Sequence, residues 1–458
     1  MALLKGAAGA EEKGDSRLQR LVSASDAMLP LRETASHRSS DCERFLPVVP
    51  LSSQTMNRSK RSMPALTGMR IFLAMWVVVF HRFTGNRADL VDVPKTLSSL
   101  ILTGYAAVSV FFVLSGFVLA YSYNLDHRWS KQEYWRFAAA RFARIYPSYL
   151  LGLLILLPLF AWRFIHTWDL IDPLKEAGTA FLNFTLLQTW LPSTALTWND
   201  PGWSLSNEAF FYACFPIVGV LLWRAKGAGK LWTIGLLLWA LSLAAPVAGM
   251  LIPIHGYGDI VATVPDGTAI SAPSNLATIF CTNPLMRIPE FCFGILLERV
   301  FSNLQNRGSS LFGKGYYLYL PGILAVILVL GQADRIPFPT VHHGLLLPAY
   351  SCIILGFALD GGVLARFLSM RSMVFLGNAS YSVYILHVPI LTWLGLVWKR
   401  VGLQSGEAVP VSLCLFVVML ISCLNYAFLE EPLHKRLKKG LQGRFQGKPT
   451  LVSENSGR

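Results

Sequence analysis

Ten apolar stretches alternate with polar segments along the chain. They lie near residues 66–84, 102–123, 145–164, 204–223, 231–252, 286–302, 317–332, 343–360, 374–397 and 409–429. Most approach the length of about 20 apolar residues that a helix needs to cross a bilayer. The two weakest are 286–302, which contains charged residues that include Arg287, Glu290 and Glu298, and 204–223, which contains Glu208. The pattern predicts an all-α, polytopic integral membrane protein with about ten transmembrane helices in a lipid bilayer.

Polar segments precede and follow this apolar region. Residues 1–62 are mixed in charge, and no apolar core of signal-peptide length follows Met1. We therefore expect a disordered cytoplasmic tail and no cleaved secretory signal. Residues 433–458 are basic and are expected to form a cytoplasmic C-terminal tail. The sequence thus predicts one transmembrane domain over residues 63–432.

Composition changes how the basic charge is interpreted. Of 458 residues, 53% are hydrophobic and 14% are charged, whereas about 25% of residues are charged in soluble domains. The net charge of +14 could indicate a nucleic-acid partner. However, 31 of the 40 Lys and Arg residues fall on one side of the membrane if the N-terminal tail is cytoplasmic. The positive-inside rule then places both termini in the cytoplasm, and we expect no nucleic-acid partner.

The first apolar stretch carries two ionisable residues. It reads LTGMRIFLAMWVVVFHRF, with Arg70 near its start and His81 near its end. Eleven helical steps of 100° bring the two side chains to the same face, about 16 Å apart along the axis. Ionisable groups inside a membrane helix are costly and usually face protein or a wet cavity. Both residues are therefore candidates for function.

A basic segment precedes the third stretch. Arg141 and Arg144 are three residues apart and share one helical face. They are either a positive flank of a transmembrane helix or a clamp for a cytosolic phosphate-bearing ligand, because guanidinium groups pair with phosphate in bidentate geometry.

A carboxylate begins the fourth stretch. Ser204, Glu208 and Tyr212 are spaced four apart and share one helical face. Capping of the helix N-terminus by Ser204 or Ser206 accounts for this carboxylate, and so does a partnership with an Arg or a His. Trp203 and the tryptophans of the preceding loop either anchor the chain at the membrane interface or stack on a flat acceptor such as a sugar.

Further polar positions lie in other apolar stretches. Arg287 and Glu290 are three residues apart and are expected to pair. His387 lies deep in the ninth stretch, as either a packing residue or a substrate ligand. Ser115 and Gly116 lie in the second, where small residues are typical of close helix packing. The seven cysteines and nine histidines show no metal-ligand or disulfide spacing, so no metal is predicted.

Seven short motifs in a fixed order give the chain a family resemblance. They are carried by Leu66, Gly68, Arg70 and His81; Phe111–Phe117; Arg141, Arg144 and Pro147; Trp203–Tyr212; Pro289–Gly294; Gly377, Ser380, Tyr381, Tyr384 and His387; and Glu430 with Pro432. Through them the sequence resembles the acyltransferase 3 family of polytopic membrane O-acyltransferases over about residues 64–436. Ile71 departs from the family pattern, since a small residue commonly follows the Arg.

The resemblance implies transfer of an acyl group, often acetyl, from cytosolic acyl-CoA to a hydroxyl group. The acceptor would be a sugar, a surface glycan or a glycosylated small molecule. The family's usual setting is a bacterial inner membrane. No tightly bound cofactor is implied, because acyl-CoA is a donor substrate.

The candidate residues fit that chemistry. A histidine has a pKa near neutrality, so His81 is suited to be the general base, with Glu208 as the predicted acidic partner. Arg70 would stabilise the thioester oxyanion or bind a CoA phosphate. Arg141 and Arg144 would hold the CoA phosphates. The predicted substrate-binding residues are Tyr212, Trp203, His387 and Ser115, of which Ser115 is also a candidate nucleophile.

Two other functions use the same features. A proton-coupled secondary transporter or exporter would place Arg, His and Glu along an ion pathway inside the membrane. A scaffold in a glycan-assembly complex would keep the fold without the activity.

Overall fold

The computed structural model describes residues 62–84, 90–166, 172–249, 275–401 and 409–445. Within these ranges the chain is helical and contains no strand, which confirms the predicted all-α class. Apart from Ser62, the predicted N-terminal tail lies outside the described residues, as does the C-terminal tail beyond residue 445.

Seven helices of the described chain are long and apolar enough to cross a membrane. They include α1 (Pro64–Thr84), α3 (Ala107–Ser122) with the short η2 (Gly104–Ala106) before it, α4 (Lys131–His166), α6 (Gly202–Trp223), α7 (Ala228–Gly249), α14 (Arg371–Arg400) and α15 (Val411–Asn425) with its continuation. These helices confirm a multi-pass integral membrane protein. An eighth span results if α12 (Leu347–Leu359) and α13 (Gly362–Leu368), which meet at 77°, count as one.

The remaining predicted stretches also form helices, but they do not meet the criteria for a span. The helix α9 (Pro284–Asn306) is long enough but carries charges, and α10 (Tyr316–Leu330) has 15 residues. About ten spans are therefore not confirmed among the described residues, and the cytoplasmic location of both termini stays a prediction.

The start of α9 is determined by nearby residues. Pro284 follows the N-cap Asn283, whose side chain accepts a hydrogen bond from the backbone N–H of Leu285 at 3.0 Å.

Shorter helices connect the long ones. They are α2 (Lys95–Leu102), α5 (Pro173–Phe184), α8 (Asn275–Thr282), α11 (Phe338–His342) and α16 (Glu431–Phe445). The π-helical turn η8 (Tyr426–Glu430) joins α15 to α16. Such turns often occur at functional sites, and this one ends on the buried carboxylate of Glu430.

Two close crossings through glycine hold the bundle together. A Cβ on Gly377 of α14 would lie 2.0 Å from the backbone oxygen of Thr67 in α1, and one on Gly294 of α9 would lie 2.0 Å from that of Val113 in α3. Gly116 meets α9 in the same way, 2.1 Å from the oxygen of Phe291. The predicted role of Gly116 in helix packing is thus confirmed. Small residues let membrane helices approach at the distance where dispersion and backbone contacts stabilise them.

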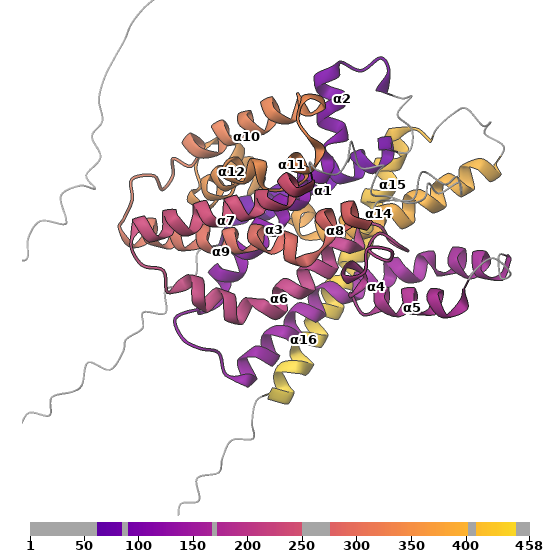
Figure 1. Ribbon diagram of the computed structural model, residues 1–458, viewed down its shortest axis with the longest axis horizontal. Helices are drawn as coiled ribbons and strands as arrows, with labels where there is room; N and C mark the ends of the chain where they lie inside the picture. Colours follow the sequence, from indigo (N-terminus) through magenta and orange to yellow (C-terminus); the bar gives the residue numbers. More distant parts are fainter. Residues whose placement is uncertain (1–61, 85–89, 167–171, 250–274, 402–408, 446–458) are drawn as a thin grey trace, which may run out of the picture. The chain divides into compact units, whose positions relative to one another are not determined.

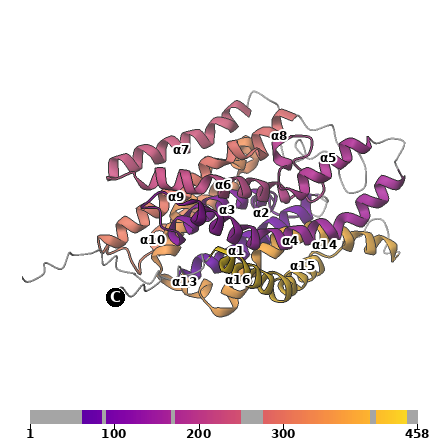
Figure 2. The same ribbon diagram turned by 90° about the horizontal axis from the view of Figure 1, so that it is seen from below.

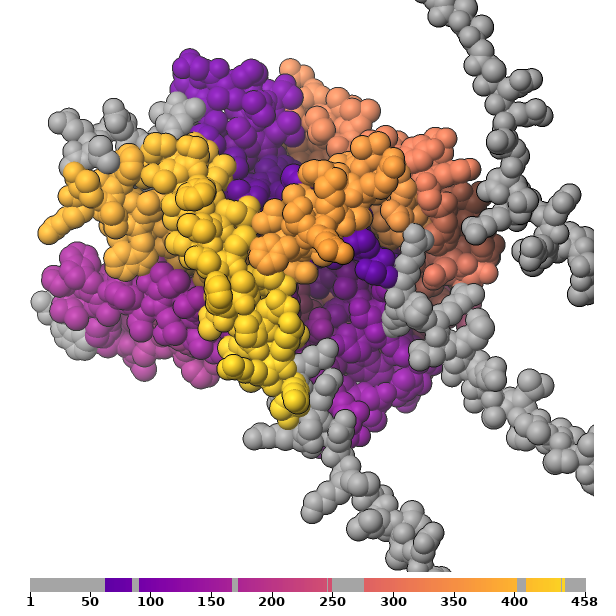
Figure 3. Space-filling view, turned by 180° about the vertical axis from the view of Figure 1, so that it is seen from behind, coloured from indigo at the N-terminus to yellow at the C-terminus, as the bar shows by residue number. Residues whose placement is uncertain are grey.

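The helices α1 and α3 lie inside the bundle (Figure 1). In the view from below, α7 runs along one side, and α13, α15 and α16 lie along the other (Figure 2). The C-terminal helices form a band across one face (Figure 3), where α16 packs on α4. The strongest packing of α1 is against α14, so the residues of these two helices can meet at the centre of the bundle.

Candidate functional site

The two ionisable residues of α1 lie in separate polar clusters. His81 lies in the last turn of α1, and Arg70 lies near its start. We call the first cluster the histidine cluster: His81, His387 and Asp200. We call the second the glutamate cluster: Glu208, Tyr212, Ser115 and Arg70. The two are joined by α1 itself, as the sequence spacing predicts.

In the histidine cluster, two imidazoles and a carboxylate come together. The rings of His81 and His387 lie 5.0 Å apart between centroids. The Nδ1 atom of His81 is 3.9 Å from a carboxylate oxygen of Asp200. The His387 Nδ1 atom is 2.7 Å from the backbone oxygen of Tyr384, so it carries the proton and donates it. The Nε2 atom of His387 is therefore a buried lone pair with no hydrogen-bond partner among the described residues.

Hydrogen bonds from α14 hold the loop that supplies Asp200. The side-chain amide of Asn199 donates to the backbone oxygen of Ile385 at 3.0 Å. The hydroxyl groups of Ser204 and Tyr384 lie 2.7 Å apart, and Ser204 also donates to the oxygen of Pro201 at 3.0 Å. These contacts tie both sides of Asp200 to the helix that carries His387. Ser204 thus positions the loop.

In the glutamate cluster, one carboxylate oxygen of Glu208 accepts two hydroxyl hydrogen bonds. Ser115 of α3 donates at 2.9 Å, and Tyr212, one turn along α6, donates a short hydrogen bond. Arg70 lies near the charged side chains of Arg144, Glu208 and Glu430 and near the Tyr212 hydroxyl. The predicted shared face of Glu208 and Tyr212 is confirmed. The Ser115 hydroxyl, a predicted candidate nucleophile, donates its hydrogen bond to the carboxylate of Glu208.

The carboxylate that the structure brings to His81, at 3.9 Å, is that of Asp200, and the predicted pairing of His81 with Glu208 stays untested. Glu208 is directed at Ser115 and Tyr212. Sequence reasoning missed Asp200 because it lies in a loop, where no helical period relates it to His81.

The two arginines of α4 have different surroundings. Arg144 forms an ion pair with the fully buried Glu430, which also accepts hydrogen bonds from Ser148 at 3.2 Å and from Ser382. The guanidinium of Arg141 lies 3.4 Å from the Tyr123 hydroxyl. Arg144 is thus held inside the bundle by α14 and η8.

Arg141 instead lines an open cavity of about 470 Å³ between α4 and α6. Tyr212 of the glutamate cluster lines the same cavity, and so do the apolar side chains of Trp135 and Phe142. The cavity therefore connects a cationic side chain near the start of α4 to the hydroxyl that binds Glu208.

Trp203 lies inside the bundle rather than at its surface. It is 4% exposed, its ring lies 6.0 Å from that of His342, and the Arg287 guanidinium lies 5.8 Å from its centroid. Arg287 and Glu290 form a fully buried ion pair at 3.1 Å, as their spacing predicts. The predicted stacking of Trp203 on a sugar stays untested.

Comparison with known proteins adds a family. The sequence model described as "Acyltransferase domain" matches residues 63–427. Acyltransferase MdmB of Streptomyces mycarofaciens is 28% identical over 342 residues, which cover 72% of this chain and 79% of MdmB. The exopolysaccharide production protein ExoZ of Rhizobium meliloti is 28% identical over 352 residues, 74% of this chain and 94% of ExoZ.

O-acetyltransferase OatA of Staphylococcus aureus is 23% identical over 400 residues, 82% of this chain. The matched region spans 58% of the length of OatA, so OatA extends well beyond it. No solved structure is significantly similar to the chain. The family match covers most of the chain and confirms the resemblance carried by the seven motifs: the protein belongs to the acyltransferase 3 family and is a membrane-embedded acyltransferase.

Proposed function

We propose that the protein transfers an acyl group from cytosolic acyl-CoA to a hydroxyl group of a sugar or glycan, with His81 as the general base. The base takes the proton of the acceptor hydroxyl as its oxygen attacks the thioester carbon. The new C–O ester bond forms, the C–S bond breaks, and the thiolate of CoA takes up a proton. General base catalysis of this kind contributes about 10²–10⁴-fold to a rate.

The observation that carries the proposal is the histidine cluster. A carboxylate 3.9 Å from His81 stabilises the imidazolium that forms when the base takes a proton. The lone pair on Nε2 of His387 faces no described hydrogen-bond donor, so it can accept a hydrogen bond from a bound acceptor. The histidine cluster thus supplies a base, its carboxylate partner and a substrate ligand in one place.

The donor end of the proposal rests on the cavity between α4 and α6. Arg141 provides a cation for a CoA phosphate there, and the apolar lining suits the uncharged arm of the donor. Arg70 lies in the glutamate cluster, where it can stabilise negative charge on the thioester oxygen. Because Arg144 is paired with Glu430, its predicted phosphate contact requires a side of the guanidinium not occupied by that carboxylate.

The acceptor is proposed from the relatives. OatA is named an O-acetyltransferase, and ExoZ is named for exopolysaccharide production. Both names suit an acceptor that is a sugar hydroxyl in a surface polysaccharide or in a glycosylated small molecule. They also suit a location in a bacterial inner membrane. No observation favours proton-coupled transport over acyl transfer.

The test uses membranes that contain the full chain, radiolabelled acetyl-CoA and a glycan fraction. We expect CoA-dependent labelling of the glycan by the wild type and by the control His127→Ala, whose side chain is exposed and pairs with Glu133 at 2.9 Å. His81→Ala is expected to lose labelling. Equal labelling by His81→Ala would remove this residue as the base. A complete lack of CoA-dependent labelling with acetyl, succinyl and longer acyl donors would favour transport or scaffolding.

A further inference from the structure

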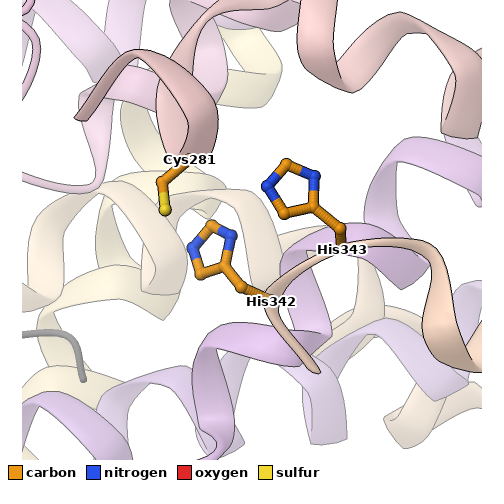
Figure 4. A group of neighbouring side chains, drawn as sticks. All are labelled: Cys281, His342 and His343. Atoms are coloured by element: carbon orange, nitrogen blue, oxygen red, sulfur yellow. The ribbon is translucent and has the colours of Figure 1, made fainter. Parts of the chain in front are cut away.

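A second cluster of chemically capable side chains lies outside the proposed catalytic site. Cys281 belongs to α8, His342 ends α11, and His343 follows it directly. Figure 4 shows the three side chains converging from these two segments of the chain. One ligand atom from each residue, the sulfur and one nitrogen per imidazole, can be chosen so that all three lie within 4.8 Å of one another.

The three side chains are buried, and three of their four ring nitrogens lack a well-formed hydrogen bond among the described residues. Cys281 and His343 are 0% exposed, and His342 is 1% exposed. The Nε2 atom of His342 has no hydrogen-bond partner among the described residues. Neither ring nitrogen of His343 has a well-formed hydrogen bond among the described residues, although one of them makes a looser hydrogen-bonding contact with the backbone of Phe280. Burying a polar nitrogen without a partner is unfavourable, so a ligand bound by these nitrogens would stabilise the folded protein.

Packing fixes the orientation of one imidazole. The His342 ring stacks on Tyr105 at 5.3 Å between centroids and with an interplanar angle of 22°. The backbone oxygen of His342 accepts a hydrogen bond from Arg287 at 2.6 Å, and its Nδ1 atom lies 3.3 Å from the same guanidinium nitrogen. The side of the ring that carries Nε2 is left for the cluster.

We propose that Cys281, His342 and His343 bind one thiophilic metal ion, with Zn²⁺ as the expected ion. Two imidazoles and one thiolate are a donor set that zinc takes in proteins, with a fourth position for another ligand. Cu⁺ is bound by the same soft donors, so the experiment below distinguishes the two. The proposed metal site departs from the expectation, drawn from sequence spacing, that no metal is bound, and it does not depend on the proposed acyl transfer.

The geometry requires a small closure. Zinc bonds of about 2.0–2.3 Å place ligand atoms roughly 3.3–3.8 Å apart, so the side chains have to approach by about 1 Å. Metal binding through Nε2 of His342 needs the proton on Nδ1, which keeps the 2.6 Å contact of Arg287 to the backbone oxygen and gives up the 3.3 Å contact to the ring. Coordination also removes the proton of the Cys281 thiol, which leaves as a free proton.

The charges near the site are balanced in part. The Arg287 guanidinium is paired with Glu290, so this arginine adds little net charge. Burial raises the pKa of the Cys281 thiol to about 12, and Arg287 acts in the opposite direction. Without metal the thiol is therefore neutral, and a bound ion would make it a thiolate. The ion would link α8 to the C-terminal end of α11 and to His343, which follows it.

The test measures metal content in the purified full chain. The protein is prepared in detergent without chelators and incubated with Zn²⁺ or with Cu⁺ under reducing conditions. After desalting, its metal content is measured by inductively coupled plasma mass spectrometry. We expect about one ion per chain in the wild type, at least tenfold less in Cys281→Ser, and wild-type content in Cys292→Ser, which changes another buried cysteine. Retention of copper but not zinc would support the site and assign it to copper.

A second measurement does not depend on the folding of a variant. Replacement of the metal in the wild type by Co²⁺ is expected to give a thiolate-to-cobalt charge-transfer band, because the ligand set contains one thiolate. Less than a tenth of an ion per chain with both metals, an unchanged content in Cys281→Ser, or bound cobalt without that band would overturn the proposal. Metal content is read without acyl transfer, so failure of one proposal leaves the other standing.

Discussion

Asp200→Asn removes the carboxylate beside the proposed base while keeping the shape of the side chain. A unit charge 3.9 Å from the imidazolium contributes about 4 kcal/mol at an effective dielectric constant of 20 and about 1 kcal/mol in water. The side chains of His81 and Asp200 are 15% and 18% exposed. We therefore expect a loss of about 2–3 kcal/mol of transition-state stabilisation, or roughly 30- to 150-fold in rate.

The assay is the initial rate of acyl transfer by the purified chain at saturating acyl-CoA, with Asp334→Asn as the control. Asp334 forms an exposed ion pair with Lys95 at 3.8 Å, so its variant should match the wild type. The KM for acyl-CoA should change little in Asp200→Asn. Asp200 lies beside His81 at the last turn of α1 and does not line the cavity that contains Arg141. A rate within threefold of the wild type would refute the role assigned to Asp200.

Three further outcomes follow from the packing and the cavity. Glu430→Gln leaves the cation of a buried pair without its anion and should lower the free energy of unfolding by about 3–5 kcal/mol, whereas Glu431→Gln, in an exposed i,i+4 pair, should cost about 0.5 kcal/mol or less; thermal unfolding in detergent measures both. Arg141→Ala should raise the KM for acyl-CoA more than the KM for the acceptor, and the reverse would contradict the phosphate contact. Gly377→Val should reduce the yield of folded protein by separating α1 from α14, while Gly395→Ala, which faces open space, should not; equal yields would refute the close crossing.

The sequence predicts the helices well because apolar length is a local property. Each of the ten apolar stretches contains a helix among the described residues. The number of spans is less predictable, because it depends on burial. Arg287 and Glu290 are tolerated in α9 because they neutralise each other inside the bundle. The spacing of apolar residues does not predict that other helices bury most of α9.

The candidate site shows the same division between local and tertiary information. The shared face of Arg70 and His81 follows from the helical repeat. The approach of His387 to His81 depends on how α1 crosses α14, which the close contact at Gly377 sets. Asp200 could not be found, since a loop brings it to His81 without any spacing rule.

Two further contacts were beyond the sequence because they join distant residues. Arg144 and Glu430 are 286 positions apart. In the sequence, Arg144 and Glu430 belong to two different motifs, and nothing in either motif indicates that the two side chains pair. The adjacency of His342 and His343 was visible in the sequence, but Cys281 reaches them only through the packing of α8.

The central claim is that His81 accepts the proton of the hydroxyl that is acylated. Its most direct test is the rate of ester formation by the purified full chain in proteoliposomes, with a defined sugar acceptor and with release of free CoA measured in parallel. The account predicts equimolar ester and CoA from the wild type, and a loss of at least about 100-fold in both for His81→Ala. Ester formation by His81→Ala at the wild-type rate would contradict it.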